Sequence, residues 1–552
     1  MNSAVVTPPP DTPPMGGRAW RVVADTPLAR TAAHPLAWII GTAIVARAWL
    51  LFRSPYVPGV NGAYYLVQTR ALLERGGLGI PDLPLTFYVH AAVAWTLAQL
   101  FHMASTDAIV WAVKGSDAIL PPLVAWPVFV LVRRWAQDGG QGDAVPLAAA
   151  ALSCIAVPWF AIVGELQKNS LALVWLALLM MTLHQWLRAQ TTKRGLAVMA
   201  SLLLLGLTHI GVLGAALVLL VTVLVVYFGQ RGNQVDWRAA LPWIVAGAAL
   251  IALCAALVMW KFDAARIQRL MTALSSPGKF ATDGKRPPGP MPITLPIVLL
   301  LPWLAFAIVA IPALVVAWLK RASLPAADVA VVVGSATTVL LLTGPWFGGD
   351  KTIRFALIAL IPAILAGAFA LLHAARPWVR RLTLGVVWLV AVGSGVAYLP
   401  QAGQAVLTDA ALTELQGLAP LILVPERTLI VAPHGAEWWS AWFLRTRIAQ
   451  VEALRAEDWG RYDQVLFLSV KPEALPKLIG RGPPSPGGGP RQGRGKDRSP
   501  RSGAGDPAPR EAGMPPEADL AHDGSYLKLG RLAAPPDFLL PGKWRFGGPP
   551  PP

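Results

Sequence analysis

Charged side chains of both signs stand near the ends of apolar stretches in three separate parts of the chain. They are Asp82 in IPDLPL, Glu165 and Lys168 in GELQKNS, and Asp350, Lys351 and Arg354 in WFGGDKTIRF. Lysine and arginine neutralise phosphate groups. A carboxylate accepts a proton from an attacking hydroxyl. If these segments meet in the folded chain, their residue types favour chemistry on a lipid-linked phosphate.

The composition indicates that most of the chain lies in a membrane. Of 552 residues, 55% are hydrophobic and only 14% are charged, whereas about 25% are charged in an average soluble protein, so a cytosolic enzyme is excluded. The net charge of +17 comes from basic residues spread over short loops and a polar tail, which does not favour nucleic acid as a partner. Cys154 and Cys254 lie in separate apolar stretches and form no disulfide framework.

Eleven apolar runs approach the length of about 20 residues that a membrane-spanning helix needs. They lie near residues 36–52, 118–132, 144–163, 170–187, 195–208, 210–228, 240–260, 294–318, 326–344, 353–373 and 381–399. Segment 86–103 is a candidate for a twelfth. Lysine and arginine in short loops favour the cytoplasmic side, and leaving 86–103 outside the bilayer puts Arg133, Arg134 and the later basic loops there. We therefore predict an α-helical multi-pass inner membrane protein with about 11 spans, a cytoplasmic N-terminus and an extracytoplasmic C-terminal region.

The segments outside the lipid divide the chain further. We predict a disordered N-terminus (1–35), a membrane domain (36–400) with a long first outer loop (53–117), a small α/β domain (403–479) and a mostly disordered tail (480–552). The α/β domain is predicted from strands at 428–433 and 464–470 with a helix from Glu437 to about Val451 between them. The tail is rich in Pro, Gly, Arg and Ser and has few apolar residues with which to form a core.

Several of the candidate residues also have a purely structural interpretation. Lys168 and Arg354 can reach lipid headgroups from helix ends, and Glu165 can simply pair with Lys168. Asp350 can cap the following helix. The tyrosines Tyr64 and Tyr65 fit an interfacial aromatic belt. The tryptophans in HGAEWWSAWFLRTR either offer a surface for sugar rings or pack the small domain.

The order of these segments resembles the GT-C superfamily of polytopic glycosyltransferases. The resemblance rests on a first span, a long outer loop with NGAYYLVQTRALLERGGLGIPDLPLTFYVHA, further spans with an arginine near an outer helix end in KTIRFALIALIPAIL, and a terminal α/β domain. It covers roughly residues 36–480. The superfamily includes protein O-mannosyltransferases, aminoarabinose transferases and the catalytic subunits of oligosaccharyltransferases.

The resemblance implies a polyprenyl-phosphate-linked sugar as donor and transfer of that sugar at the extracytoplasmic face. Such enzymes usually carry an acidic residue just ahead of an amphipathic helix that contains a tyrosine and an arginine. Tyr64, Tyr65 and Arg70 match that helix, but Asn61 stands at the acidic position. An amide accepts no proton at neutral pH, so either Asp82 or Glu165 supplies the base or the chain is not a catalyst.

The resemblance assigns provisional roles to ten residues. Asp82 and Glu165 would be catalytic, Lys168, Lys351 and Arg354 would bind the donor phosphate, and Asn61, Tyr64, Tyr65, Arg70 and Asp350 would bind substrate. Glu165 or Asp350 can also hold a divalent cation, although no metal motif with diagnostic spacing is present and the cation is optional. The alternatives are a transporter or flippase of lipid-linked saccharide and a non-catalytic assembly subunit.

Overall fold

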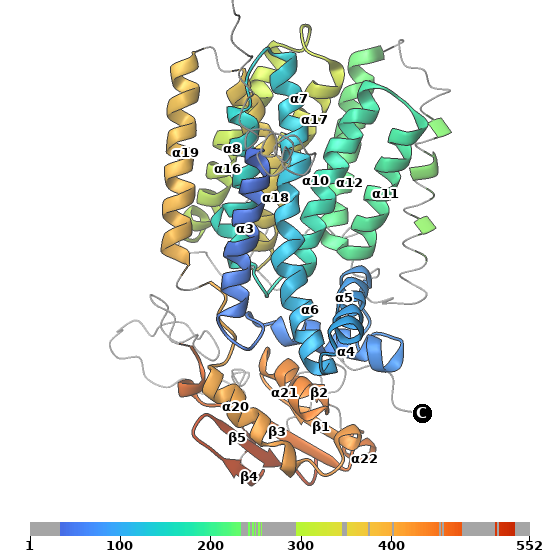
Figure 1. Cartoon of the computed structure of the whole chain (residues 1–552), viewed down its shortest axis with the longest axis vertical. Helices are drawn as coiled ribbons and strands as arrows, with labels where there is room; N and C mark the ends of the chain where they lie inside the picture. Colours follow the sequence, from blue (N-terminus) through green and yellow to red (C-terminus); the bar gives the residue numbers. More distant parts are fainter. Residues whose placement is uncertain are drawn as a thin grey trace, which may run out of the picture.

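A bundle of long helices and a small domain with a β-sheet stand end to end (Figure 1). The computed structural model describes residues 34–232, scattered positions between 241 and 256, and residues 294–344, 350–373, 376–399, 402–451, 454, 457–476, 514–515 and 518–535. The predicted span 240–260 and segments 1–33 and 477–513 therefore lie wholly or mainly outside the described residues.

The helices of the bundle follow the apolar runs of the sequence. They are α3 (Pro35–Phe52), α7 (Ala125–Asp138), α8 (Ala144–Ile155), α9 (Val157–Ala161), α10 (Gln167–Arg188), α11 (Thr192–Thr208), α12 (Ile210–Arg231), α16 (Thr294–Leu319), α17 (Ala326–Leu342), α18 (Asp350–Leu372) and α19 (Pro377–Tyr398). A helix satisfies its own backbone hydrogen bonds, as lipid requires. Among the described residues, seven helical stretches are long and apolar enough to cross a membrane.

The segment predicted as a long outer loop, 53–117, is mostly helical. It contains α4 (Gly62–Arg75), α5 (Leu85–Phe101) and α6 (Ser105–Ile119), and a short 3-10 turn, η1 (Pro121–Val124), joins α6 to α7. One apolar stretch therefore runs from Ser105 to Asp138, and the predicted start of this span at residue 118 was wrong. Lys114 and Asp117 interrupt the apolar run in the sequence, but both side chains are buried and paired inside the protein.

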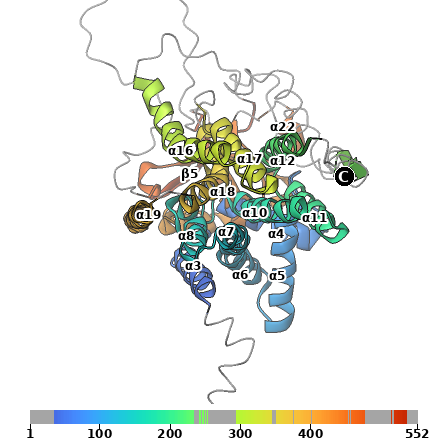
Figure 2. The same cartoon turned by 90° about the horizontal axis from the view of Figure 1, so that it is seen from above.

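Helix α5 runs across the bundle axis. Seen along that axis, it extends sideways while the bundle helices are viewed end-on (Figure 2). It has only 17 residues. Helix α5 is therefore not aligned with the helices of the bundle.

The C-terminal domain is built on a five-stranded mixed sheet in the order β2-β1-β3-β5-β4. The strands are β1 (Thr428–Val431), β2 (Arg447–Ala449), β3 (Gln464–Val470), β4 (Asp519–Asp523) and β5 (Leu527–Arg531), and the helices are α20 (Asp409–Gly417), α21 (Ala436–Leu444) and α22 (Asp458–Arg461). Strand β1 is parallel to β2 and β3, with Leu429 opposite Val465, whereas β5 is antiparallel to β3.

One prediction for this domain was wrong. The helix expected to reach Val451 ends at Leu444, because Arg445 adopts the left-handed conformation (φ 56°) and starts the turn into β2. Within the tail predicted as mostly disordered, 480–552, the described residues 518–535 form β4 and β5, which were not predicted. Leu527 and Leu529 alternate with polar residues and are fully buried, so this short piece of the tail completes the sheet.

One apolar core joins the first outer segment to the C-terminal domain. Tyr65, Phe87 and Ile109 from α4, α5 and α6 belong to the same buried cluster as Trp439 and Leu466. Burial of apolar surface on this scale holds elements rigidly together. The side chains of α4 are therefore fixed with respect to both the bundle and the domain.

Candidate functional site

Two glycines bring the loop ahead of α4 against the loop ahead of α10. Gly59 and Gly164 both have positive φ, 88° and 74°, which favours glycine. A Cβ on Gly59 would lie 2.5 Å from Oε2 of Glu165, and one on Gly164 would lie 2.5 Å from the carbonyl oxygen of Pro58. Only glycine, which has no Cβ, allows the two loops to approach so closely. As a result, Glu165 lies directly beside the start of α4.

Asn61, the residue at the predicted acidic position, binds the carboxylate of Glu165. Its backbone N–H donates to Oε2 (3.0 Å) and its side-chain amide donates to Oε1 (2.6 Å). The first N–H groups of a helix carry a partial positive charge that favours an anion. A carboxylate from a distant loop therefore stands just ahead of α4, and the amide of Asn61 holds it there.

Asp82 and Lys168 form an ion pair beside this carboxylate. Asp82 is 1% exposed, and its carboxylate accepts hydrogen bonds from the ammonium of Lys168, the hydroxyl of Tyr64 and the backbone N–H of Leu83. The ammonium of Lys168 also lies 5.4 Å from the ring centre of Tyr64. Lys168 is thus anchored within the protein and is not merely extended toward lipid headgroups.

Tyr65 contacts the backbone of both Glu165 and Lys168. Its hydroxyl accepts from the backbone N–H of Lys168 (3.4 Å) and donates to the backbone carbonyl of Glu165 (3.5 Å). Burial raises the pKa of Tyr65, and the negative charges of Glu165, Asp117 and Asp82 raise it further. The phenol therefore stays protonated at neutral pH.

Arg354, at the start of α18, faces the same region. The pKa of His434 in the C-terminal domain is raised, mainly by the hydrogen bond between its imidazole and Glu437 (2.9 Å). The charge of Glu165 raises this pKa further, and the charge of Arg354 lowers it. Residues from the α9–α10 loop, α18 and the domain thus act on one imidazole. The side chains of Asp350 and Lys351, two other predicted site residues, lie outside the described part of the structure.

Arg70 lies apart from these charges and fastens α4 to α21. Its guanidinium donates to the carbonyl oxygens of Ala441 (2.6 Å) and Trp442 (2.7 Å) and stacks on the Trp442 ring at 4.8 Å. Burial lowers the pKa of Arg70 to about 10. Trp438, Trp439 and Trp442 are all buried, so these tryptophans pack the domain and offer no exposed surface to a sugar ring.

A buried ion pair between Arg47 and Asp117, which was not predicted from the sequence, supports the site. Arg47 of α3 donates to Asp117 of α6 (2.7 Å) and to the carbonyl of Trp159 (2.8 Å), and the other oxygen of Asp117 accepts from the backbone N–H of Gly164 (2.8 Å). Both charged side chains are fully buried. The arginine inside the first apolar run was the visible signal, since a charge within a span needs a partner.

Replacing Asp117 with Asn should lower the free energy of unfolding by roughly 3–5 kcal/mol, because Arg47 then keeps a buried charge without a counter-ion. Denaturant titration of the purified protein in detergent measures this loss. Asp107→Asn, at an exposed position of the same helix, is the matched control and should change stability little. Equal stability of Asp117→Asn and the control would contradict the assignment.

No metal centre is formed by the described residues. Within them, no three His, Cys, Asp or Glu side chains gather as ligands of one ion would. The optional divalent cation considered from the sequence therefore has no ligand cluster in this part of the chain.

Comparison with known proteins identifies the fold. Neither a protein-family model nor the sequence of a curated protein matches the chain. Among solved structures, it resembles the apo oligosaccharyltransferase of Archaeoglobus fulgidus, with a TM-score of 0.51 and 13% identity over 79% of this chain and 69% of that one. ArnT from Cupriavidus metallidurans gives a TM-score of 0.46 in the apo state (14% identity; 82% and 93% covered) and 0.47 when bound to undecaprenyl phosphate (14%; 78% and 92%). The chain has a GT-C-like fold.

Proposed function

We propose that the protein is a membrane glycosyltransferase that moves a sugar from a polyprenyl-phosphate-linked donor to an acceptor at the extracytoplasmic face. The observation that carries this proposal is the carboxylate of Glu165, held by Asn61 at the start of α4. The resemblance to the GT-C superfamily implies an acidic residue just ahead of α4. Glu165, from the loop ahead of α10, supplies a carboxylate at this position. The similarity of the fold to that of the archaeal oligosaccharyltransferase also supports a glycosyltransferase function.

Glu165 is a better candidate for the base than Asp82. It is partly exposed, whereas Asp82 is 1% exposed and engaged by Lys168 and Tyr64. In the proposed reaction Glu165 accepts the proton of the acceptor hydroxyl as that oxygen bonds to the anomeric carbon. The bond from the anomeric carbon to the phosphate oxygen breaks, and the carrier phosphate leaves with the electron pair.

The leaving phosphate needs positive charge nearby. Arg354 and Lys168, with Lys351, are the proposed partners, since fixed cations stabilise charge that develops on a leaving group. The ammonium of Lys168 has three N–H donors, so it can remain bonded to Asp82 while donating to a phosphate. Asp82 is then the residue that positions Lys168.

The distribution of basic residues supports the proposed orientation. Helix α6 starts near the C-terminal domain and α7 continues to the opposite end of the bundle (Figure 1). Arg188, at the end of α10, pairs there with Asp138 and Asp328. Arg133, Arg134, Lys193 and Arg194 belong to the same end. Because basic loops favour the cytoplasm, we place the N-terminus inside and the C-terminal domain outside.

Reconstituted transfer tests the proposal. The full chain in proteoliposomes is given a panel of polyprenyl-phosphate-linked sugars and a membrane extract as acceptor, and the release of free polyprenyl phosphate is measured. We expect release that depends on the extract. Movement of the intact lipid-linked saccharide across the bilayer with no cleavage would instead identify a transporter. If the protein shows neither activity, both hypotheses are wrong and the assembly subunit remains.

A further inference from the structure

A cavity of about 250 Å³ lies between α4 and the C-terminal domain, away from the carboxylate of Glu165. It is lined on the α4 side by Arg70, Glu74 and Arg75, and on the domain side by Glu426, Tyr462 and residues 445–448, which lead from the end of α21 into β2. Tyr64, which donates to Asp82, and Gln68, which donates to the Tyr64 hydroxyl, are not among the lining residues. The cavity and the proposed catalytic site therefore use different faces of α4.

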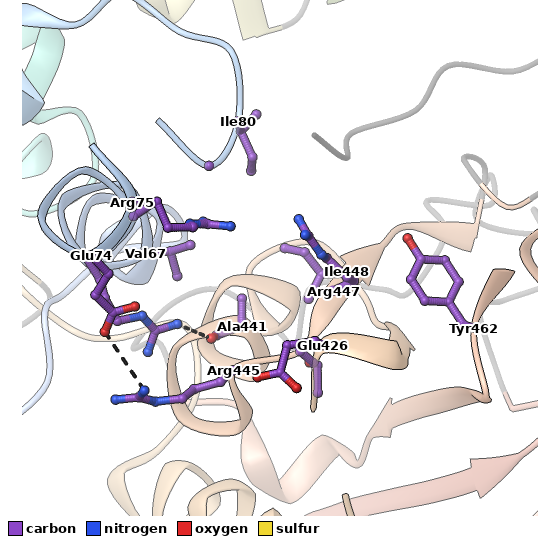
Figure 3. Close-up of a pocket in the computed structure, with 14 residues that line it drawn as sticks. Val67, Glu74, Arg75, Ile80, Glu426, Ala441, Arg445, Arg447, Ile448 and Tyr462 are labelled. Carbon is purple, nitrogen blue, oxygen red and sulfur yellow. Dashed lines mark hydrogen bonds and ion pairs between the residues drawn. The ribbon is translucent and has the colours of Figure 1, made fainter. Parts of the chain in front are cut away.

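The charge of this cavity is positive and partly uncompensated. Four arginines line it against two glutamates. Arg70 is engaged by backbone carbonyls, and Arg445 lies 3.9 Å from Glu74. The guanidinium groups of Arg75 and Arg447 form no ion pair or hydrogen bond with any described residue. Figure 3 shows both extending into the space between the helix and the domain.

Uncharged groups that line the same cavity also indicate that it binds a ligand. The hydroxyl of Thr446 is buried, the residue being 6% exposed, and it has no hydrogen-bond partner among the described residues. Buried polar groups normally have partners, so this hydroxyl lacks one that a ligand can supply. Tyr462, Val67 and Ile448 provide apolar surface beside it, and an aromatic ring suits the flat face of a sugar.

We propose that this cavity binds a saccharide that carries an anionic group, either a carboxylate or a phosphate ester. Guanidinium groups match the two oxygens of either anion with paired hydrogen bonds. Arg75 and Arg447 hold the anion, Thr446 bonds to a sugar hydroxyl and Tyr462 packs against the ring. The binding does not depend on glycosyl transfer, so a failure of the proposed function leaves this site to be judged on its own test.

The test measures binding by calorimetry with the full chain in nanodiscs of uncharged lipid. The probes are an oligouronate, a sugar phosphate, an uncharged oligosaccharide of the same length and inorganic phosphate. We expect at least one of the two anionic sugars to bind, with the uncharged one far weaker, and which of them binds identifies the anion. Arg75→Gln and Arg447→Gln should each weaken that binding by about tenfold or more, as expected for one charge-assisted hydrogen bond.

Two further variants keep the test independent of misfolding. Lys528→Gln removes a positive charge from β5, which β1 and β3 separate from β2 in the sheet, and should leave affinity unchanged. Glu74→Gln removes a negative charge from the cavity and should tighten binding several-fold, which a damaged protein cannot do.

The proposal is overturned if neither anionic sugar binds, if Lys528→Gln weakens binding as much as Arg75→Gln, or if the uncharged sugar binds equally well. Equal affinity for inorganic phosphate and the sugar phosphate, with no binding of the oligouronate, would overturn the saccharide assignment.

Discussion

Glu165→Gln is expected to lower the rate of sugar transfer by about 10²–10⁴-fold, the usual contribution of a general base. Glutamine has the same shape as glutamate, and its oxygen can still accept from the backbone N–H of Asn61, while the Asn61 side chain turns its own oxygen toward the new NH2 group. The glutamine amide accepts no proton from the acceptor hydroxyl. The rate of carrier-phosphate release in proteoliposomes measures the effect, and binding of the lipid-linked donor should change little.

The control for this variant is Asp107→Asn, which removes one negative charge at an exposed position of α6. It should transfer sugar at the rate of the unaltered protein. If Glu165→Gln also retains that rate within a few-fold, Glu165 is not the base. A loss of thermal stability in Glu165→Gln that matches its loss of rate would likewise assign the residue a structural role.

Lys168→Met is expected to act on both stability and transfer. Asp82, with a fully buried carboxylate, loses its cation, which should lower the free energy of unfolding by roughly 3–5 kcal/mol. Loss of a cation at the leaving phosphate should also reduce the transfer rate by about 10²–10³-fold. Denaturant titration in detergent and the transfer assay measure the two effects separately.

A double variant separates the structural role of Lys168 from its chemical role. Asp82→Asn combined with Lys168→Met removes both charges, so no buried ion is left without a partner, and most of the stability should return. Transfer should not return, because the phosphate still lacks the ammonium. Recovery of transfer together with stability would mean that Lys168 serves only to neutralise Asp82.

The sequence singled out Asp82, Glu165 and Lys168 as candidates, but it did not predict the contacts that they make. Asp82 and Lys168 are 86 residues apart, yet they form the ion pair at the centre of the cluster. Glu165 was expected to pair with Lys168 or to serve as the base, and its contact with Asn61 was not foreseen. That contact depends on the close approach of Gly59 and Gly164, and such an approach between distant loops has no local pattern in a sequence.

The fold was predictable where one apolar run makes one element. The strand at 464–470 matches β3 in both of its ends, because it is a continuous apolar stretch with turns on either side. The prediction failed where buried charges interrupt such a run, as Lys114 and Asp117 do in α6, and where the partner strand is distant. Strands β4 and β5 are separated from β3 by a long polar segment, so composition alone assigned them to a disordered tail.

Photolabelling with a reactive polyprenyl-phosphate analogue tests the central claim most directly, namely that the α4 region and the loop ahead of α10 form one site for a lipid-borne phosphate. The full chain in nanodiscs is labelled and digested, and the labelled peptides are identified by mass spectrometry. We expect labels near residues 64–87 and near residues 165–168. An excess of unlabelled carrier phosphate should displace them, and Lys168→Met should reduce them. Labels confined to the opposite end of the bundle, around the ends of α7 and α10, would contradict it.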